Sequence, residues 1–351
     1  MAATVIMLGY GDMDTSEFQE PASKVVRAHT EGCSTDGSLD KLRWGACSIQ
    51  GWPDYMEDSF AVCVDNKDLI LGVYDGHRGS KVSSFCAQRL HIELLQTRAD
   101  TGKDFSTCLA ETFMRMDELL LNKSKQDEDL KHQGSTSLVV VINEGKLVVA
   151  NTGDCRCVLY RQGKAVELSR DHCGNVGCEK SRVEGAGGYV KEGRVYSSSL
   201  DSMGLGVSRA IGDLDYKMNT QLPTEMQVVI ASPEITEVDI EDDEFIVLAS
   251  DGIWGSRSSD DVVKFVAKQL KDGAVSLSGI CRDLAESCLT SDGKHSSSRD
   301  NMTVIIVRLS YFQSRPELMP ESGRQNQSAG TDPRENEDEI HESTRKKQKC
   351  G

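Results

Sequence analysis

Short aliphatic runs bounded by glycine or polar residues recur through the middle of the chain, a pattern typical of buried β-strands. These runs predict strands at residues 42–49, 59–64, 69–74, 137–142, 147–150, 157–160, 165–168, 245–249 and 302–307. Residues 143–146 have the composition of a hairpin turn, so the two strands that flank them should pair with each other.

Apolar residues spaced three and four apart predict amphipathic helices between these strands. We expect long helices at residues 80–95, 105–121, 260–272 and 277–289, and a short one at 179–184. Ser259 is the predicted N-cap of the third long helix, and Gly273 marks its C-terminal end. The apolar faces of these helices are more typical of core packing than of a cofactor site.

Both ends of the chain lack this regular pattern. Residues 1–40 are rich in Gly, Ser, Thr and Asp, and we expect a loosely ordered leader with room for one short paired strand. Residues 312–351 contain too few apolar side chains to offset the entropy of ordering them, so we expect a disordered polar tail. The folded domain should therefore span residues 41–311. The tail ends in a basic cluster at residues 345–349, which fits a nuclear localisation signal and a solvated charge run equally well.

The overall charge limits the possible partners. A net charge of −16 and a pI near 4.9 argue against binding to nucleic acid, which depends on clustered Lys and Arg, and against a general affinity for anionic membranes. No apolar run approaches the length that spans a bilayer. An anionic substrate would need a local source of positive charge, such as a bound metal.

The chain has twelve cysteines, but nothing at its start resembles a signal peptide. Several of them, such as Cys63 and Cys281, stand among apolar residues, where a reduced thiol acts as a small hydrophobic group. The paired spacing of a zinc site is missing. We therefore expect reduced thiols in a reducing intracellular compartment, the cytoplasm, the nucleus or both.

Carboxylates recur at the ends of the predicted strands, and several stand beside glycine: Glu57, Asp58, Asp75, Asp154, Asp251 and Asp300. Taken alone, the sequence Asp75-Gly76-His77 is more typical of a polar turn than of a site. Carboxylates gathered at one edge of a sheet would repel strongly unless they shared cations. A ligand set made only of oxygen favours Mg²⁺ or Mn²⁺ over Zn²⁺. Two such ions could activate a water for in-line displacement at phosphorus, whereas the lysine-bearing glycine-rich loop of kinases and ATPases is missing.

These motifs stand in the order found in a known family: residues 51–58 (GWPDYMED), 73–79 (VYDGHRG), 134–136, 151–156, 171–172, 179–188, 206–213 (GVSRAIGD), 249–254 (ASDGIW) and 300–303 (DNMT). Over residues 42–310 the chain resembles the metal-dependent protein phosphatases of type 2C, particularly their plant branch. The resemblance implies an α+β fold, a four-layer αββα sandwich in which helices flank two antiparallel β-sheets. It places a two-metal site where the sheets meet.

The resemblance also assigns roles to residues of this chain. The implied metal-binding residues are Glu57, Asp58, Asp75, Gly76, Asp154, Asp251 and Asp300. Asp75 would bridge two Mg²⁺ or Mn²⁺ ions, Asp58 would lie in or beside the ligand set, and Asp154 would hold a weaker third ion. His77 would protonate the leaving serine or threonine alkoxide, with no phosphoenzyme. The expected function is a monomeric phosphatase that acts on phosphorylated proteins.

Three positions depart from the family pattern. Pro53 replaces an arginine that usually holds the substrate phosphate, Arg78 replaces a glycine, and Gly255 replaces an acid associated with the third ion. A six-residue expansion also lengthens the loop at residues 196–203. We hypothesise that Arg78 partly replaces the missing arginine, because its planar fork of donors suits a phosphate; the alternative is that it is simply solvated.

Two other functions remain open at this point. Pro53 and Gly255 favour a catalytically weak homologue that binds phosphoproteins or kinases, whereas Asp75, His77 and Asp251 favour an enzyme. A metal hydrolase of small phosphate esters is less favoured, because the long loops between residues 171 and 227 suit a protein substrate.

Overall fold

Two six-stranded antiparallel sheets form the centre of the computed structural model, which describes residues 4–8, 29–198, 204–241, 243–274, 276–289 and 299–309. In spatial order, the first sheet contains β1 (Thr4–Leu8), β4 (Ser59–Asp65), β5 (Asp68–Tyr74), β8 (Ser137–Asn143), β9 (Lys146–Thr152) and β15 (Glu234–Asp239). The second contains β11 (Lys164–Glu167), β10 (Arg156–Arg161), β16 (Asp243–Ala249), β17 (Met302–Arg308), β3 (Leu42–Gly51) and β2 (His29–Leu39). All these residues belong to one structural unit, which extends from Met1 to Ser314.

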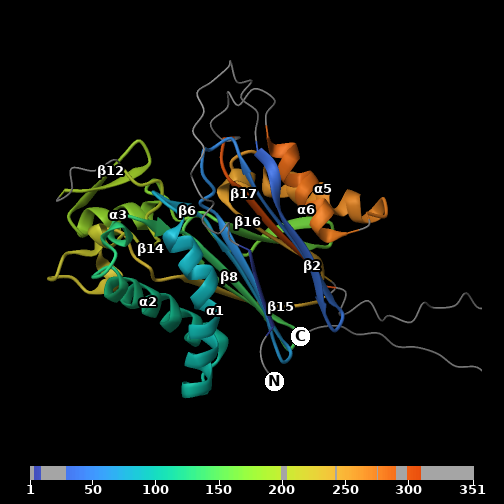
Figure 1. Cartoon of the computed structure of the whole chain (residues 1–351), viewed down its shortest axis with the longest axis horizontal. Helices are drawn as coiled ribbons and strands as arrows, with labels where there is room; N and C mark the ends of the chain where they lie inside the picture. Colours follow the sequence, from blue (N-terminus) through green and yellow to red (C-terminus); the bar gives the residue numbers. More distant parts are fainter. Residues whose placement is uncertain are drawn as a thin grey trace, which may run out of the picture. The chain divides into compact units, whose positions relative to one another are not determined.

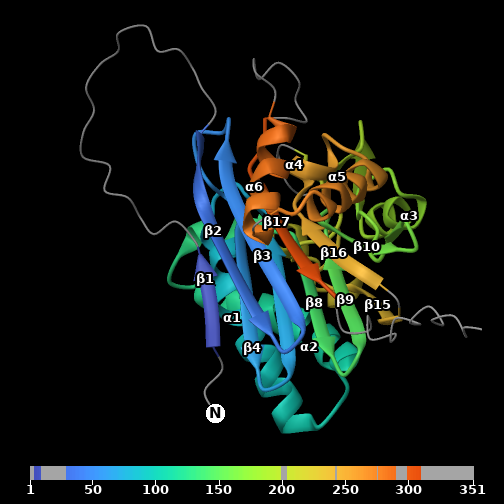
Figure 2. The same ribbon diagram turned by 90° about the vertical axis from the view of Figure 1, so that its right-hand side faces the viewer.

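Helices cover the outer face of each sheet (Figure 1). The long helices α1 (Lys81–Thr101) and α2 (Phe105–Lys123) pack on the first sheet, and α4 (Asp251–Trp254), α5 (Ser259–Lys271) and α6 (Leu277–Cys288) pack on the second. Figure 2 shows β2, β3, β17 and β16 side by side, with α6 lying over this sheet. The four-layer α+β sandwich implied by the resemblance is confirmed.

Successive side chains of the central strands point to opposite faces of their sheet, so each strand contributes both to the core between the sheets and to the core under the helices. In β17, Ile305 and Val307 enter the core between the sheets, while Val304 and Ile306 face the helices of the second sheet. Every residue of β5 is buried. Strands that are buried on both faces read as continuous aliphatic runs, which is why the sequence predicts them well.

A smaller lobe stands beside the sandwich and has its own apolar core. It contains α3 (Gly177–Gly185), the hairpin of β12 (Gly188–Lys191) and β13 (Arg194–Ser197), and residues 204–231 with the 3₁₀ turns η2 (Leu214–Lys217) and η3 (Thr224–Met226). The short strands β6 (Gly76–His77), β7 (Gly134–Ser135) and β14 (Ile211–Gly212) form a sheet that joins the lobe to the sandwich. A further 3₁₀ turn, η1 (Glu128–Lys131), follows α2.

The described part of residues 1–40 contains more paired strand than the hydrophobic pattern predicts. Two strands lie within residues 1–40: β1 pairs with β4, and β2 pairs with β3 along most of its length. β2 is an edge strand with alternating exposed side chains, so its backbone pairing leaves little hydrophobic signal. Gly37 is required there, because a Cβ atom at that position would overlap the indole of Trp44.

Smaller differences concern element ends. Helix α5 is capped by Ser258, whose side chain accepts a hydrogen bond from the backbone of Asp261, and not by Ser259. The hairpin β12–β13 and strand β15 were not predicted, because their side chains are largely exposed or intermediate. The eleven cysteines of the described residues are free thiols. In the same residues no helix combines the length and apolarity needed to cross a bilayer. The predicted tail and its basic cluster lie outside the described residues.

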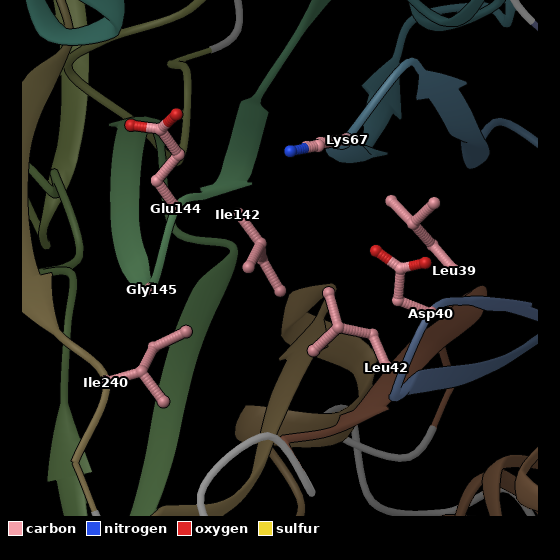
Figure 3. A pocket seen from close by; sticks show the side chains of 8 residues that line it. All are labelled: Leu39, Asp40, Leu42, Lys67, Ile142, Glu144, Gly145 and Ile240. Carbon is pink, nitrogen blue, oxygen red and sulfur yellow. The ribbon is translucent and has the colours of Figure 1, made fainter.

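The end of the sandwich opposite the strand-end carboxylates is closed by hairpin turns around a pocket of about 270 Å³. Its apolar lining is Leu39, Leu42, Ile142 and Ile240. Figure 3 shows these four side chains pointing into the pocket, with the charged Asp40, Lys67 and Glu144 around it. The same strands thus end in aliphatic packing on one side and in acidic residues on the other.

A buried ion network ties α3 to the segment that follows β13. Glu179 on α3 is 2 % exposed and receives hydrogen bonds from Arg182 at 2.8 Å, Arg209 at 2.6 Å and Ser208 at 2.8 Å. Burial alone would raise the pKa of Glu179, but the two guanidinium groups and the hydroxyl lower it to about 2. Glu179 is therefore ionised in the folded protein and anchors residues 208–209.

We expect Glu179→Gln to destabilise the protein by about 3–5 kcal/mol at pH 7, because two partly buried arginines lose their shared counter-charge. The contribution of Glu179 is present above its usual pKa of 4.5 and is lost as the pH falls toward about 2, so the difference from the wild type should shrink over that range.

Urea unfolding of the two proteins at several pH values measures this difference. The matched control is Glu184→Gln on the same helix, which removes an exposed pair with Lys180 and should cost less than about 1 kcal/mol. Equal losses in the two variants would contradict the anchoring role.

Candidate metal centre

Five carboxylates from both sheets meet in one cavity of about 370 Å³ at the end of the sandwich. They are Glu57, Asp75, Asp154, Asp251 and Asp300. Each follows or precedes a central strand: Asp75 follows β5, Asp251 follows β16, and Asp300 precedes β17. β5 is buried at every residue and β16 at every residue but one, so the backbone that carries Asp75 and Asp251 is held by packing and cannot move to relieve the repulsion between the carboxylates.

The tightest group consists of Asp75, Asp154 and Asp251, whose carboxylate oxygens lie within 4.8 Å of one another. Burial raises the pKa of Asp75 well above its usual range, and the neighbouring carboxylates raise it further. Burial and Asp251 do the same to the pKa of Asp154. Burial also raises the pKa of Asp300 to about 7, again with a contribution from Asp251.

This donor set fits divalent cations. Oxygen atoms from five carboxylates converge, and one of them, Oδ1 of Asp251, is buried without a hydrogen-bond partner. A buried carboxylate oxygen without a donor is unfavourable unless a cation supplies the missing charge. Neither Cys nor a second imidazole is among the described residues that line the cavity, so the set suits hard ions such as Mg²⁺ or Mn²⁺.

Asp58 lies beneath the cavity and not in its wall. Its Oδ2 accepts hydrogen bonds from the hydroxyls of Ser250 at 2.8 Å and Thr303 at 2.7 Å, and the residue is 5 % exposed. Burial raises the pKa of Asp58 to about 7. Asp58 therefore links the chain around Glu57 to the ends of β16 and β17.

Backbone hydrogen bonds fix the acidic residues from outside the cavity. The backbone N–H of Asp75 donates to the hydroxyl of Thr136 at 3.1 Å, and the N–H of Thr136 donates to the carbonyl of Asp75 at 2.9 Å. Asn301 accepts from the N–H of Glu57 at 2.7 Å. Gly76 also lines the cavity, and a Cβ atom there would collide with the carbonyl of Glu57.

His77 enters the same cavity and is held by a buried acid that the sequence analysis missed. Its Nε2 lies 2.6 Å from Oδ2 of Asp213, which is fully buried at the start of η2. Gly134 lies directly under this pair, since a Cβ atom at that position would overlap both Asp213 and His77. In the sequence, Asp213 stands beside Gly212 at the end of the 206–213 motif, much as Asp75 stands beside Gly76. This pairing of an acid with a glycine is the feature that could have marked Asp213 as a site residue.

Two guanidinium groups also line the cavity among the described residues, Arg78 and Arg194. Arg78 was predicted, and it adopts a left-handed backbone conformation with φ of 61°. Its side chain donates to the hydroxyl of Tyr216 at 3.1 Å and lies over the ring of that residue. Arg194 was not predicted, because it belongs to the unforeseen hairpin β12–β13.

The two missing family residues leave no charged replacement at their own positions. Pro53 is not part of the cavity wall, and its carbonyl accepts a hydrogen bond from Gln50 at 2.8 Å. Gly255 donates its backbone N–H to the carbonyl of Asp251 at 2.7 Å and contributes no side chain. Neither Pro53 nor Gly255 supplies a charged side chain, and the cluster of Asp75, Asp154 and Asp251 forms without them.

Comparison with known proteins agrees with this site. The family model described as "Protein phosphatase 2C" matches residues 42–297. The chain is 38 % identical over 343 residues to "Probable protein phosphatase 2C 60" of Arabidopsis thaliana, covering 84 % of this chain and 94 % of that protein. It is 37 % identical over 326 residues to "Probable protein phosphatase 2C 21" of the same plant, covering 80 % and 90 %.

A solved structure, the serine-threonine phosphatase 2C from Toxoplasma gondii, superposes with a TM-score of 0.66 at 19 % identity, over 79 % of this chain and 99 % of the other. That likeness supports the fold, and the family model and the plant relatives supply the family. The chain belongs to the protein phosphatase 2C family of metal-dependent serine/threonine phosphatases.

Proposed function

We propose that the chain hydrolyses phosphoserine and phosphothreonine in proteins, with two Mg²⁺ or Mn²⁺ ions held by Glu57, Asp75, Asp251, Asp300 and the carbonyl of Gly76. The observation that carries this proposal is the convergence of five carboxylates in one cavity beside a histidine. Asp154 would hold a weaker third ion. When bound, such ions supply a polarised water and positive charge against the phosphoryl oxygens.

The residues of the chain would supply proton transfer and positioning. Asp213 fixes one ring nitrogen of His77, so the other nitrogen, Nδ1, is the atom available to deliver a proton to the leaving alkoxide. Arg78 stands on the cavity wall and would add positive charge near the phosphate. Ion affinity then depends on the carboxylates, whereas departure of the alcohol depends on the pair of His77 and Asp213.

Pro53 and Gly255 motivate the finer part of the proposal, that phosphate capture and the third ion are weaker than is usual in the family. Loss of one charge-assisted contact of this kind lowers affinity by roughly 10- to 150-fold. The alternative is a pseudophosphatase that binds phosphoproteins or kinases. The intact carboxylate cluster and the held histidine favour the enzyme.

Hydrolysis of a phosphothreonine peptide with Mn²⁺ tests the function. We expect activity that EDTA abolishes and that Asp75→Asn and Asp251→Asn each lower by at least about 100-fold, because each removes a charged ligand from the cluster. The matched control is Asp260→Asn, an exposed acid on α5 outside the cavity, which should retain activity. Wild-type protein that is no more active than the two ligand variants would support the binding-module alternative.

Metal affinity should fall as the pH is lowered through about 7. Burial raises the pKa of Asp300, which lines the cavity, to about 7, and a carboxylate must lose its proton before it binds a cation. Each displaced proton makes binding about tenfold weaker per pH unit below that value. The same raised pKa makes the stability of the metal-free protein depend on pH. The protonated carboxyl group favours the folded state, and this contribution to the free energy of unfolding is complete below about pH 4 and is lost as the pH rises through about 7.

Calorimetric titration with Mn²⁺ at pH 6 and pH 8, in two buffers with different ionisation enthalpies, measures both the affinity and the protons released. More protons should be released at the lower pH. An affinity that does not change between the two pH values would show that the carboxylates are already ionised in the free protein.

Asp213→Asn should lower kcat by roughly 10- to 100-fold while leaving Mn²⁺ affinity unchanged, because it alters the positioning of His77 and no cavity carboxylate. The pH profile of kcat should also change, which a purely structural defect would not produce. The matched control is Asp215→Asn, which breaks a second acid–histidine pair, with His132, that does not line the cavity. Similar losses of kcat in both variants would refute the positioning role.

A further inference from the structure

Arg194 is a charged residue of the cavity wall to which neither the resemblance nor the proposed mechanism gives a role. It lies at the start of β13, and its side chain lines the same cavity as Asp75, Asp154 and Asp251. The cavity is therefore bordered by the sandwich on one side and by this hairpin of the lobe on the other. An arginine at such a place can meet a substrate that has reached the acidic cluster.

The Arg194 side chain is fixed but only partly used. Its Nε donates to the carbonyl of Gly204 at 2.7 Å, which is the one hydrogen bond it makes among the described residues. Among the described residues, no acceptor takes a hydrogen bond from either terminal amino group of the fork. An arginine anchored through Nε loses little further side-chain entropy when those amino groups bind an anion.

The anchor of Arg194 is itself rigid. Val195 and Leu205 exchange two backbone hydrogen bonds of 2.8 Å, which hold β13 against residues 204–205. Gly204 lies against the ring of Tyr196, where a Cβ atom would not fit. Tyr196 in turn stacks on Tyr189 across the hairpin with ring centroids 4.9 Å apart. The carbonyl that holds Arg194 is thereby fixed by backbone pairing and by two aromatic rings.

Charge explains what such a group could bind. Five carboxylates line the cavity, and two divalent ions would offset four of their charges. The site would then keep a net negative charge, so a phosphate dianion needs a positively charged side chain in addition to the two ions. Arg78 is shared with the hydroxyl of Tyr216, and position 53 offers a proline. The terminal amino groups of Arg194 have no acceptor in the part of the chain that the structure describes, and its planar fork matches two phosphate oxygens.

We propose that Arg194 binds the phosphate group of the substrate and supplies the contact that an arginine at position 53 provides elsewhere in the family. This inference rests on the proposed function, because it places the substrate phosphate in the same cavity. The competing role for Arg194 is structural: its bond to Gly204 could serve only to close the hairpin onto residues 204–205.

Kinetics of Arg194→Ala and Arg194→Lys separate the two roles. We expect Arg194→Ala to lower kcat/KM by roughly 10- to 100-fold for a phosphothreonine peptide and also for p-nitrophenyl phosphate, because both carry the phosphate. The inhibition constant of inorganic phosphate should rise by a similar factor. Arg194→Lys keeps the charge without the fork and should fall between the wild type and Arg194→Ala.

The matched control is Lys191→Ala. Lys191 pairs with Arg194 in the register of the hairpin, but it is exposed and does not line the cavity. The Lys191→Ala substitution therefore removes the same charge from the same hairpin without changing the cavity. It should change kcat/KM by less than about threefold. Thermal unfolding of all variants shows whether the hairpin remains folded.

Calorimetric binding of inorganic phosphate to the Mn²⁺-loaded protein gives a readout that does not depend on turnover. Weaker phosphate binding in Arg194→Ala, with unchanged Mn²⁺ affinity, supports the proposal even if the wild type hydrolyses nothing, an outcome that would overturn only the proposed function. Phosphate binding and inhibition within about threefold of the wild type would overturn the role of Arg194. A loss confined to the peptide substrate would also overturn it, because the contact would then be to the peptide and not to the phosphate.

Discussion

Repulsion among carboxylates gathered in one cavity is the constraint on which this structure depends. Asp75, Asp154 and Asp251 hold their oxygens within 4.8 Å, in surroundings that raise the pKa of each. Such a group persists only if its backbone cannot move away. The strands that precede Asp75 and Asp251 are aliphatic, are buried almost throughout and form part of two packed sheets, so the packing of the sandwich keeps the charges together. A cation is the natural partner of that arrangement.

The side chains around the cavity come from two bodies with different tasks. The sandwich supplies the carboxylates, and Thr136 and Asn301 fix their backbone. The lobe supplies Asp213, which holds His77, and Arg194, which faces the cavity from the hairpin. On the proposed function, metal binding would rest on the core of the sandwich, whereas proton transfer and phosphate binding would rest on the separate core of the lobe.

The sequence was most informative where burial was complete. Strands such as β5 and β16 stand out as aliphatic runs, and the acids at their ends follow at once. Edge strands such as β2 and β15 keep polar side chains in water, so their pairing leaves little trace in the sequence. Glu57 and Asp58 are neighbours just before β4, yet one lines the cavity and the other lies beneath it, a difference that the sequence does not indicate.

Arg194 shows why the remainder could not be predicted. Its position depends on the bridge between Val195 and Leu205 and on the ring of Tyr196, which are contacts between segments that the hydrophobic pattern does not relate. Asp213 is a similar case, since its partner His77 is 136 residues away in the chain. The sequence motifs can mark such residues as candidates, but only the folded structure shows which side chains they contact.

The lobe's separate core has a consequence for how this protein could lose or regain activity. A small apolar core joined to a large one through two-residue strands can open locally at a lower free energy than the whole domain. In that open form the carboxylates would stay in place on the sandwich while the support of His77 and Arg194 was lost. Ion occupancy and catalytic competence are then two distinct properties of the molecule, and a modification or partner that acts on the lobe alone could silence the enzyme while its ions remained bound.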